Sequence, residues 1–175
     1  MKNSWIILCA MFILTACNSV KKVSREKVTE RVYPIQSKSG SEVEGKIILT
    51  QEKEKVRLNV SVRGLPLGIH AMHLHEKADC SSPDGNSAGG HWNPTTENHG
   101  KWGHGEFHKG DISNMMVDGN GKAELSFATT AWCIGCKDDR RDILGKALVI
   151  HEKADDFKTQ PTGNAGKRVG CAEIK

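Results

Sequence analysis

Three histidines lie within residues 68–76, at spacings of three and then two residues. If this stretch is a strand, alternate side chains face opposite sides, so His73 and His75 share one face and His70 lies on the other. Imidazole is the commonest ligand of transition metals in proteins. Two histidines on one face of a rigid strand therefore predict half of a metal site, although a single pair of this kind also arises by chance or on an ordinary surface.

The other histidines can supply the missing ligands. All eight histidines of the chain fall between His70 and His151 instead of being spread along its length. The long segment after the first histidines contributes His91, His99, His104 and His108, followed closely by Asp111. Histidines with a carboxylate are typical of a four-coordinate zinc site. Together with His73, His75 and His151, these side chains suffice for two metal ions.

Short strands are the elements that must position these ligands. The chain has 175 residues, of which 37% are hydrophobic and only 5% aromatic, with 18 glycines; this is enough for one domain with a real core. Residues 56–63 alternate apolar and polar side chains without a break, which is typical of a strand with one buried face. Strands are predicted, with no convincing helix, over residues 31–36, 43–51, 56–63, 68–76, 110–117, 122–128, 146–150 and 167–174. The pattern predicts an all-β domain, a sandwich or barrel with Greek-key connections.

Long irregular segments separate some of these strands. Residues 77–109 are rich in Gly, Asn, Pro, Ser and His and show no clear period. A segment of this length without regular structure is unusual in a compact domain unless it is functional or pinned, and metal and a disulfide could pin it. In contrast, Asp-Gly-Asn-Gly at residues 118–121 is a short hairpin signal between two predicted strands.

The start of the chain predicts export. Lys2 precedes a short apolar run over residues 5–14, which is too short to cross a bilayer as a helix and is typical of a signal peptide. Leu-Thr-Ala-Cys at residues 14–17 resembles a bacterial lipobox, which implies a signal peptide over residues 1–16 and acylation of Cys17. An ordinary signal peptide cut nearby is the alternative.

The next segment is polar and charged, without apolar periodicity. We interpret residues 17–29 as a flexible, lipid-anchored tether for a domain over residues 30–175. The expected location is the periplasmic side of a bacterial cell envelope, anchored to the outer membrane. The net charge of +4 includes no concentrated basic arm with interleaved aromatics, so nucleic acid is not an expected partner.

Export places the remaining cysteines in an oxidising compartment, where disulfides persist. Cys9 leaves with the leader and Cys17 carries the lipid. The cysteines of the domain are Cys80, Cys133, Cys136 and Cys171. Four cysteines allow three pairings, and spacing alone does not choose among them.

Six motifs, in order and correctly spaced, resemble those of the copper/zinc superoxide dismutases, here in a bacterial lipoprotein form. They are HLHE at 73–76, GGHWNP at 89–94, His99, HKGD at 108–111, HEKADD at 151–156 and GNAGKR at 163–168. The resemblance runs from about residue 43 to the C-terminus. It implies an immunoglobulin-like, eight-stranded Greek-key barrel with long metal-binding and electrostatic loops. It also implies dismutation of superoxide to oxygen and hydrogen peroxide.

The same resemblance implies one copper and one zinc per subunit. Copper would be held by His73, His75, His91 and His151. Zinc would be held by His91, His99, His108 and Asp111. His91 would bridge both metals as an imidazolate and handle a proton while copper is alternately reduced and oxidised. Arg168 would be the second catalytic residue, because a fixed cation attracts and orients the superoxide anion. His104 matches neither set, and we expect it to be a solvated loop histidine.

Further residues are implied to support the metals without binding them. Asp155 matches a carboxylate that links His73 to His99, an orienting role common at metal sites. His70 matches a framework histidine that supports the copper site. Thr162 matches a residue that narrows the substrate channel.

The resemblance also pairs two of the cysteines. It implies a disulfide between Cys80 and Cys171, which would tie the ligand loop to the last strand. Cys133 and Cys136 lie in an insertion, Trp-Cys-x-x-Cys, that resembles a thioredoxin-type redox motif but lacks the βαβ context of one. We favour a local structural disulfide there over a redox or additional metal role.

Two other classes of function remain as alternatives. A copper-binding or storage lipoprotein would keep the fold without turnover, yet Arg168 and all copper ligands are present. A zinc-loaded binding module or hydrolase would need a nucleophile or general-base pair, and none is visible. The Cys133 insertion falls in the loop that helps to form the dimer interface of animal enzymes, so both a monomer and a homodimer remain open.

Overall fold

The computed structural model describes residues 29–175 of the chain. The predicted signal peptide, Cys17 and the tether as far as residue 28 lie outside the described residues, so these remain predictions. Within the described part, no helix is long and apolar enough to cross a membrane.

Eight strands form the domain, as the sequence predicts, and their ends differ from the predicted ones by at most two residues. They are β1 (Thr29–Ser37), β2 (Glu44–Glu52), β3 (Lys55–Arg63), β4 (Gly68–His75), β5 (Asp111–Val117), β6 (Lys122–Thr129), β7 (Lys146–His151) and β8 (Arg168–Ile174). The one helical element among the described residues is a short 3-10 turn, η1 (Asn86–Ala88).

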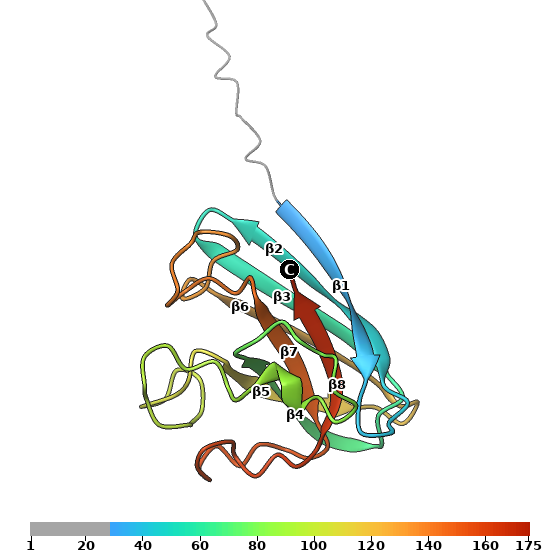
Figure 1. Cartoon of the computed structure of the whole chain (residues 1–175). Coiled ribbons are helices and arrows are strands. Elements are labelled where there is room, and N and C mark those ends of the chain that lie inside the picture. Colours follow the sequence, from blue (N-terminus) through green and yellow to red (C-terminus); the bar gives the residue numbers. More distant parts are fainter. Residues whose placement is uncertain (1–28) are drawn as a thin grey trace, which may run out of the picture.

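The strands are antiparallel and follow the order β5-β4-β7-β8-β1-β2-β3-β6. Two four-stranded layers result, β1-β2-β3-β6 and β5-β4-β7-β8 (Figure 1). β1 joins them, because most of it pairs with β2 while Gln36 and Ser37 pair with Cys171 and Gly170 of β8. The outcome is a nearly closed Greek-key barrel, which confirms the predicted fold class.

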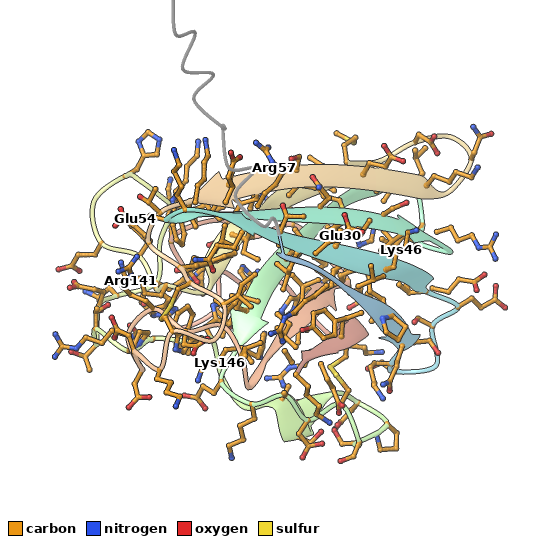
Figure 2. The ribbon with its side chains drawn as sticks, turned by 90° about the horizontal axis from the view of Figure 1, so that it is seen from above. Glu30, Lys46, Glu54, Arg57, Arg141 and Lys146 are labelled. Carbon is orange, nitrogen blue, oxygen red and sulfur yellow. A yellow bond between two sulfur atoms is a disulfide. The ribbon has the colours of Figure 1, made fainter. Side chains whose placement is uncertain are left out.

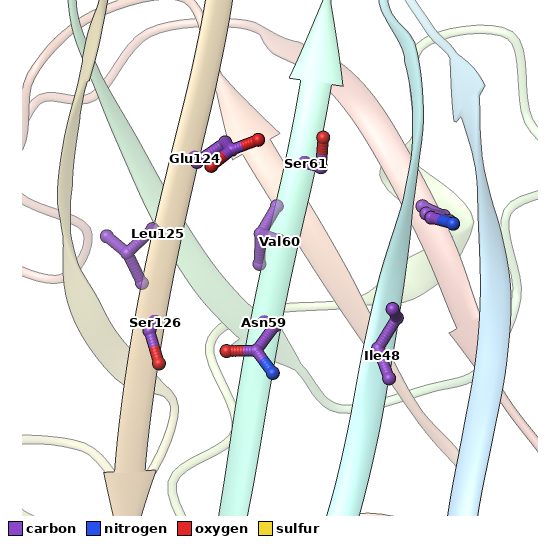
Figure 3. A pocket seen from close by; sticks show the side chains of 8 residues that line it. Ile48, Asn59, Val60, Ser61, Glu124, Leu125 and Ser126 are labelled. Atoms are coloured by element: carbon purple, nitrogen blue, oxygen red, sulfur yellow. The ribbon is translucent and has the colours of Figure 1, made fainter.

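The core lies between the two layers. The alternation in β3 places Val56, Leu58, Val60 and Val62 inside, all nearly fully buried. Side chains of the opposite period, such as Arg57, are exposed on the outer side of this layer (Figure 2). This outer face is polar and carries a shallow hollow over β2, β3 and β6, lined among others by Asn59, Ser61, Glu124 and Ser126 (Figure 3).

The turn at residues 118–121 forms, but the prediction that it joins two paired strands of a hairpin is wrong. Asp118 accepts hydrogen bonds from the backbone N–H groups of Asn120 and Lys122 and so fixes the chain reversal. The strands on either side then separate, since β5 pairs with β4 and β6 pairs with β3 along eight residues. The turn residues determine the local reversal, whereas burial of the inward face of β6 determines its partner.

The layer that carries β4 and β7 is buried on both faces. Every residue of β4 from His70 to His75 is buried. The outer face is covered by the segment between β4 and β5, and a second small apolar cluster forms there from Cys80, Ala88, Ala147, Val149 and Cys171. The disulfide Cys80–Cys171, which spans 91 residues, joins the covering segment to β8. Closing a loop of that length stabilises the fold by about 4–5 kcal/mol in the chain-entropy model.

Candidate metal centre

The two faces of β4 separate its side chains as the sequence predicts. Met72 and Leu74 point into the core, whereas His73 and His75 lie on the outer face under the covering segment, both fully buried. His70 is also buried, with Nδ1 2.9 Å from the carbonyl oxygen of His151 and Nε2 3.0 Å from that of Pro66. The ring therefore lies between two backbone carbonyl groups behind the histidine groups.

A first group contains the four histidines His73, His75, His91 and His151, whose ligand atoms lie within 4.8 Å of one another. The Nε2 atoms of His75 and His151 are 3.4 Å apart. Nδ1 of His73 and Nε2 of His91 are buried without a hydrogen-bond partner. Buried polar atoms are rarely left unpaired, so four nitrogens that converge in this way fit a metal ion.

A second group contains His91, His99, His108 and Asp111. Oδ1 of Asp111 lies 2.9 Å from Nδ1 of His91 and 3.3 Å from Nδ1 of His108, and these two nitrogens are 3.5 Å apart. Nδ1 of His99 lies 3.0 Å from Oδ2 of Asp111. Four ligands at zinc bond lengths around a tetrahedral centre are separated by about 3.3 Å. The second group therefore fits zinc in both chemistry and spacing.

His91 belongs to both groups. Its Nδ1 is the atom that lies near Asp111 and His108, whereas its unpaired Nε2 is available to the first group. The ring stacks at a tilt on His73, with centroids 4.0 Å apart. One imidazole thus offers one nitrogen to each group.

Asp155 links the two groups from behind. Its Oδ2 lies 2.8 Å from Nε2 of His73 and its Oδ1 lies 2.9 Å from Nε2 of His99. The carboxylate is itself held, because Phe157 donates its N–H to Oδ1 and Asn114 exchanges two hydrogen bonds with the Asp155 backbone. Each histidine is therefore oriented with its Nδ1 toward its group.

The sequence did not predict the supporting roles of three residues. Asn114 holds Asp155, and Gln160 exchanges two hydrogen bonds with the backbone of His99. Gly163 has φ of 66°, and a Cβ there would lie 1.8 Å from Oδ1 of Asp155, so no other residue fits. Only Gly163 had a sequence signal, through its place in a matched motif. The amides are ordinary polar residues in the sequence.

Burial and neighbouring charges set the ionisation of the metal-free groups. Burial lowers the pKa of His91 to about 4, against the opposing effect of Asp111. Burial also lowers the pKa of His75 and His151 well below the usual value, and neighbouring histidines add to this. Neutral imidazoles are the form that binds metals, so these rings are ready as ligands at neutral pH.

In the second group, hydrogen bonds and neighbouring charges outweigh burial in setting the pKa values of His99 and Asp111. Burial opposes the charged form of His99, but hydrogen bonds with Asp111 and Asp155 outweigh it and raise the pKa of His99 to about 9. Burial likewise disfavours the Asp111 carboxylate, yet His108, His91 and His99 hold its pKa far below the usual range. Asp111 is therefore anionic, as a zinc ligand must be.

An open pocket reaches the first group from solvent. Its lining includes His75 and His151 together with Thr162, Lys167 and Arg168. Arg168 is half-buried and donates a hydrogen bond from Nη1 to the carbonyl oxygen of Gly85, 2.7 Å away. Burial lowers the pKa of Arg168, opposed by the nearby Asp84 carboxylate, and a guanidinium keeps its charge in proteins.

The remaining predicted residues lie as follows. His104 is exposed and belongs to neither group. Cys133 and Cys136 form a local disulfide, and both cysteines lie outside the pocket lining. The residues expected for copper, zinc and substrate guidance are thus brought together, while the insertion lies elsewhere.

Comparison with known proteins decides the family. The family model described as copper/zinc superoxide dismutase matches residues 43–174. The chain belongs to the copper/zinc superoxide dismutase family. It is accordingly an oxidoreductase that dismutes superoxide, and its family uses copper and zinc.

Similar proteins come from distant sources. A Cu-Zn superoxide dismutase of Paramecium bursaria Chlorella virus 1 is 37% identical, covering 97% of this chain and 91% of the viral protein. Superoxide dismutase [Cu-Zn] 1 of Aquifex aeolicus is 31% identical over the whole of both chains. The crystal structure of a SOD-like protein from Bacillus subtilis matches with a TM-score of 0.75 at 30% identity, covering 85% of this chain and all of that one.

The shared role of Asp155 leads to a testable expectation. Asn at this position keeps one acceptor oxygen but loses the other, so Asp155→Asn should release one of the two histidines that it orients. Loss of such a partner typically lowers metal affinity about 10–100-fold. Competition with chelators should show weaker binding of metal in the affected group. Asp156→Asn is the matched control, because Asp156 is exposed and binds only its own loop. Equal affinities in the two variants would contradict the orienting role.

Proposed function

We propose that the first group holds copper, the second holds zinc, and His91 joins them as an imidazolate. The copper ligands would be Nδ1 of His73 and Nε2 of His75, His91 and His151. The zinc ligands would be Nδ1 of His91, His99 and His108 and Oδ1 of Asp111. The observation that carries this assignment is the placement of His91, with one nitrogen toward each group. When bound, copper supplies a one-electron couple, whereas zinc does not change oxidation state.

His91 is the proton-handling residue in this proposal. Dismutation converts two superoxide anions and two protons to oxygen and hydrogen peroxide. Nε2 of His91 is buried and unpaired, so it can take up a proton in one half of the cycle and release it in the other. Nδ1 remains held on the side of Asp111, so the ring keeps its orientation while the proton moves.

Arg168 binds and orients the anion. It lies with His75 and His151 around the same open pocket, and its hydrogen bond to Gly85 restricts where the guanidinium can lie. A fixed cation at the entrance of a site raises the rate at which anions arrive. Thr162 lines the same pocket, where we propose that it narrows the path of the substrate.

The pocket also favours turnover over metal storage. A storage protein needs its metal enclosed, whereas two histidines of the first group line an open pocket beside Arg168. The lining offers no hydroxyl paired with a general base, so it gives no support to a hydrolase. Superoxide dismutation is the function that uses both the open pocket and the cation.

The central experiment measures metal content and superoxide consumption in the same samples. The protein loaded with one copper and one zinc should consume superoxide. His91→Ala should lose affinity for both metals and lose activity, because one ring serves both groups. His104→Ala is the control, since that exposed histidine belongs to neither group. Full loading without activity would overturn the enzyme proposal. Unchanged zinc in His91→Ala would overturn the bridge.

Removal of Arg168 should separate guidance from metal binding. Arg168→Ala should keep both metals but slow the reaction at limiting superoxide about tenfold or more, within the range expected for electrostatic steering. Arg57→Ala removes the same charge from the opposite layer, where the side chain is exposed (Figure 2), and should have little effect. If the two variants consume limiting superoxide at the same rate, the proposal that Arg168 attracts and orients the anion is wrong.

We also propose that the enzyme is a lipoprotein tethered to the periplasmic face of the outer membrane through Cys17. The support is the apolar run followed by Leu-Thr-Ala-Cys, as expected for a lipidated bacterial export signal. Cys17→Ser should abolish incorporation of radiolabelled palmitate and move the protein from the membrane fraction to the soluble fraction. Cys9→Ser lies within the leader and should change neither. Labelling of Cys17→Ser at the normal level would exclude this anchor.

A further inference from the structure

Four aromatic side chains, which we call the aromatic cluster, join the ligand loop to the barrel. Trp102 and Phe107 come from the loop, Phe127 from β6, and Trp132 from the segment after β6. Trp102 lies with its ring centroid 4.9 Å from Phe107 and 4.9 Å from Phe127. Trp132 lies 5.0 Å from Phe127 and 5.6 Å from Trp102. The cluster therefore connects the loop that carries His99 to the frame of the barrel.

Trp132 makes a second contact that the other rings do not. It is fully buried, and its indole Nε1–H donates a hydrogen bond to the carbonyl oxygen of Lys109, 2.9 Å away. Lys109 lies inside the turn between His108 and Asp111, which is closed by a hydrogen bond from the N–H of Asp111 to the carbonyl oxygen of His108. The indole thus holds the peptide that sets the separation of two ligands of the second group.

The Asp111 carboxylate also supports the turn, because its Oδ2 accepts a hydrogen bond from the N–H of His108. Among the described residues, Trp132 is the one side chain from outside the turn that hydrogen-bonds to the turn's backbone.

Gly110, which follows Lys109 in the turn, is held by backbone hydrogen bonds. Its N–H donates to the carbonyl oxygen of Trp92, and its carbonyl oxygen accepts from the N–H of Leu74. The bond from Leu74 attaches the turn to β4, and the bond to Trp92 attaches it to the segment between β4 and β5. Trp132 is the side chain that attaches it to the segment after β6.

Trp132 is itself fixed by the insertion that follows it. The N–H of Cys133 donates to the carbonyl oxygen of Arg141, and the N–H of Ile143 donates to the carbonyl oxygen of Cys133. The disulfide Cys133–Cys136 closes this segment. The insertion, which the dismutation chemistry does not use, therefore provides a rigid mount for the indole.

We propose that Trp132 is a positioning residue for zinc, mounted on the Cys133–Cys136 segment and acting through the carbonyl oxygen of Lys109. The inference rests on the proposed zinc site. Partners that orient metal ligands without touching the metal strongly affect affinity. Trp132 extends this support to the backbone between two ligands, so its loss should weaken zinc and leave copper in place.

The test compares two substitutions of the same type. Trp132→Phe removes the indole N–H while keeping an aromatic ring in the cluster. Trp102→Phe is the matched control, because no described residue accepts a hydrogen bond from the Trp102 indole. Each variant is loaded with copper and zinc, and release of zinc to a chromogenic chelator is followed at neutral pH. Trp132→Phe should release zinc about tenfold faster than Trp102→Phe, with equal copper content. Rates within twofold of each other would overturn the proposal.

Two further measurements separate positioning from general stability. Cobalt(II) in the zinc site should show a changed visible absorption spectrum in Trp132→Phe but not in Trp102→Phe, since a merely structural role would leave the ligand geometry intact. An unchanged spectrum overturns the proposal.

The other measurement uses the unmutated protein and so does not depend on how a variant folds. Adding Zn²⁺ to the metal-free protein should slow solvent exchange of the Trp132 indole proton and leave that of Trp102 unchanged. An unchanged Trp132 exchange rate overturns the proposal. Failure of the proposed function would give a different result, because the unmutated protein would then bind no zinc at the second group.

Discussion

The structure depends on one buried imidazole that must offer a nitrogen to each of two ligand groups. His91 can do this only if its ring is held from all sides. Asp111 lies at Nδ1 and His73 stacks against the ring face. The backbone of His91 forms an isolated bridge with His75 of β4. The position of the His91 ring between the two ligand groups therefore follows from how the long segment after β4 is attached to that strand.

That attachment places the metal chemistry outside the barrel instead of inside it. The core between the layers is filled by apolar side chains such as Leu74 and Ile150. The histidines use the other face of β4 and β7, which would be exposed if the loops did not cover it. The disulfide Cys80–Cys171 pins one side of the cover, and the Trp132 indole holds another. The strands supply His73, His75 and His151 of the first group and Asp111 of the second. The segment between β4 and β5 supplies the enclosure together with His91, His99 and His108.

Burying so many ionisable groups together is costly unless each has a partner. Asp155 and Asp111 are both buried carboxylates, and both are held ionised by hydrogen bonds from histidines and backbone N–H groups. Gly163 is required where the chain passes Asp155, since any side chain would enter the carboxylate. The framework around the metals is thus a set of mutually satisfied polar groups.

The sequence by itself determined the strands, the faces of β4 and a set of candidate ligands that still included His104. Strand alternation is a local property with a period of two, and the clustering of histidines is visible in the chain. The family resemblance supplied the division of ligands between two metals and the pairing of Cys80 with Cys171. Only the tertiary structure decided the partners of β5 and β6, which nitrogen of each histidine faces which group, and the support from Asn114, Gln160 and Trp132. These features depend on contacts between residues far apart in the chain, whose geometry follows from packing and burial and leaves no periodic signal in the sequence.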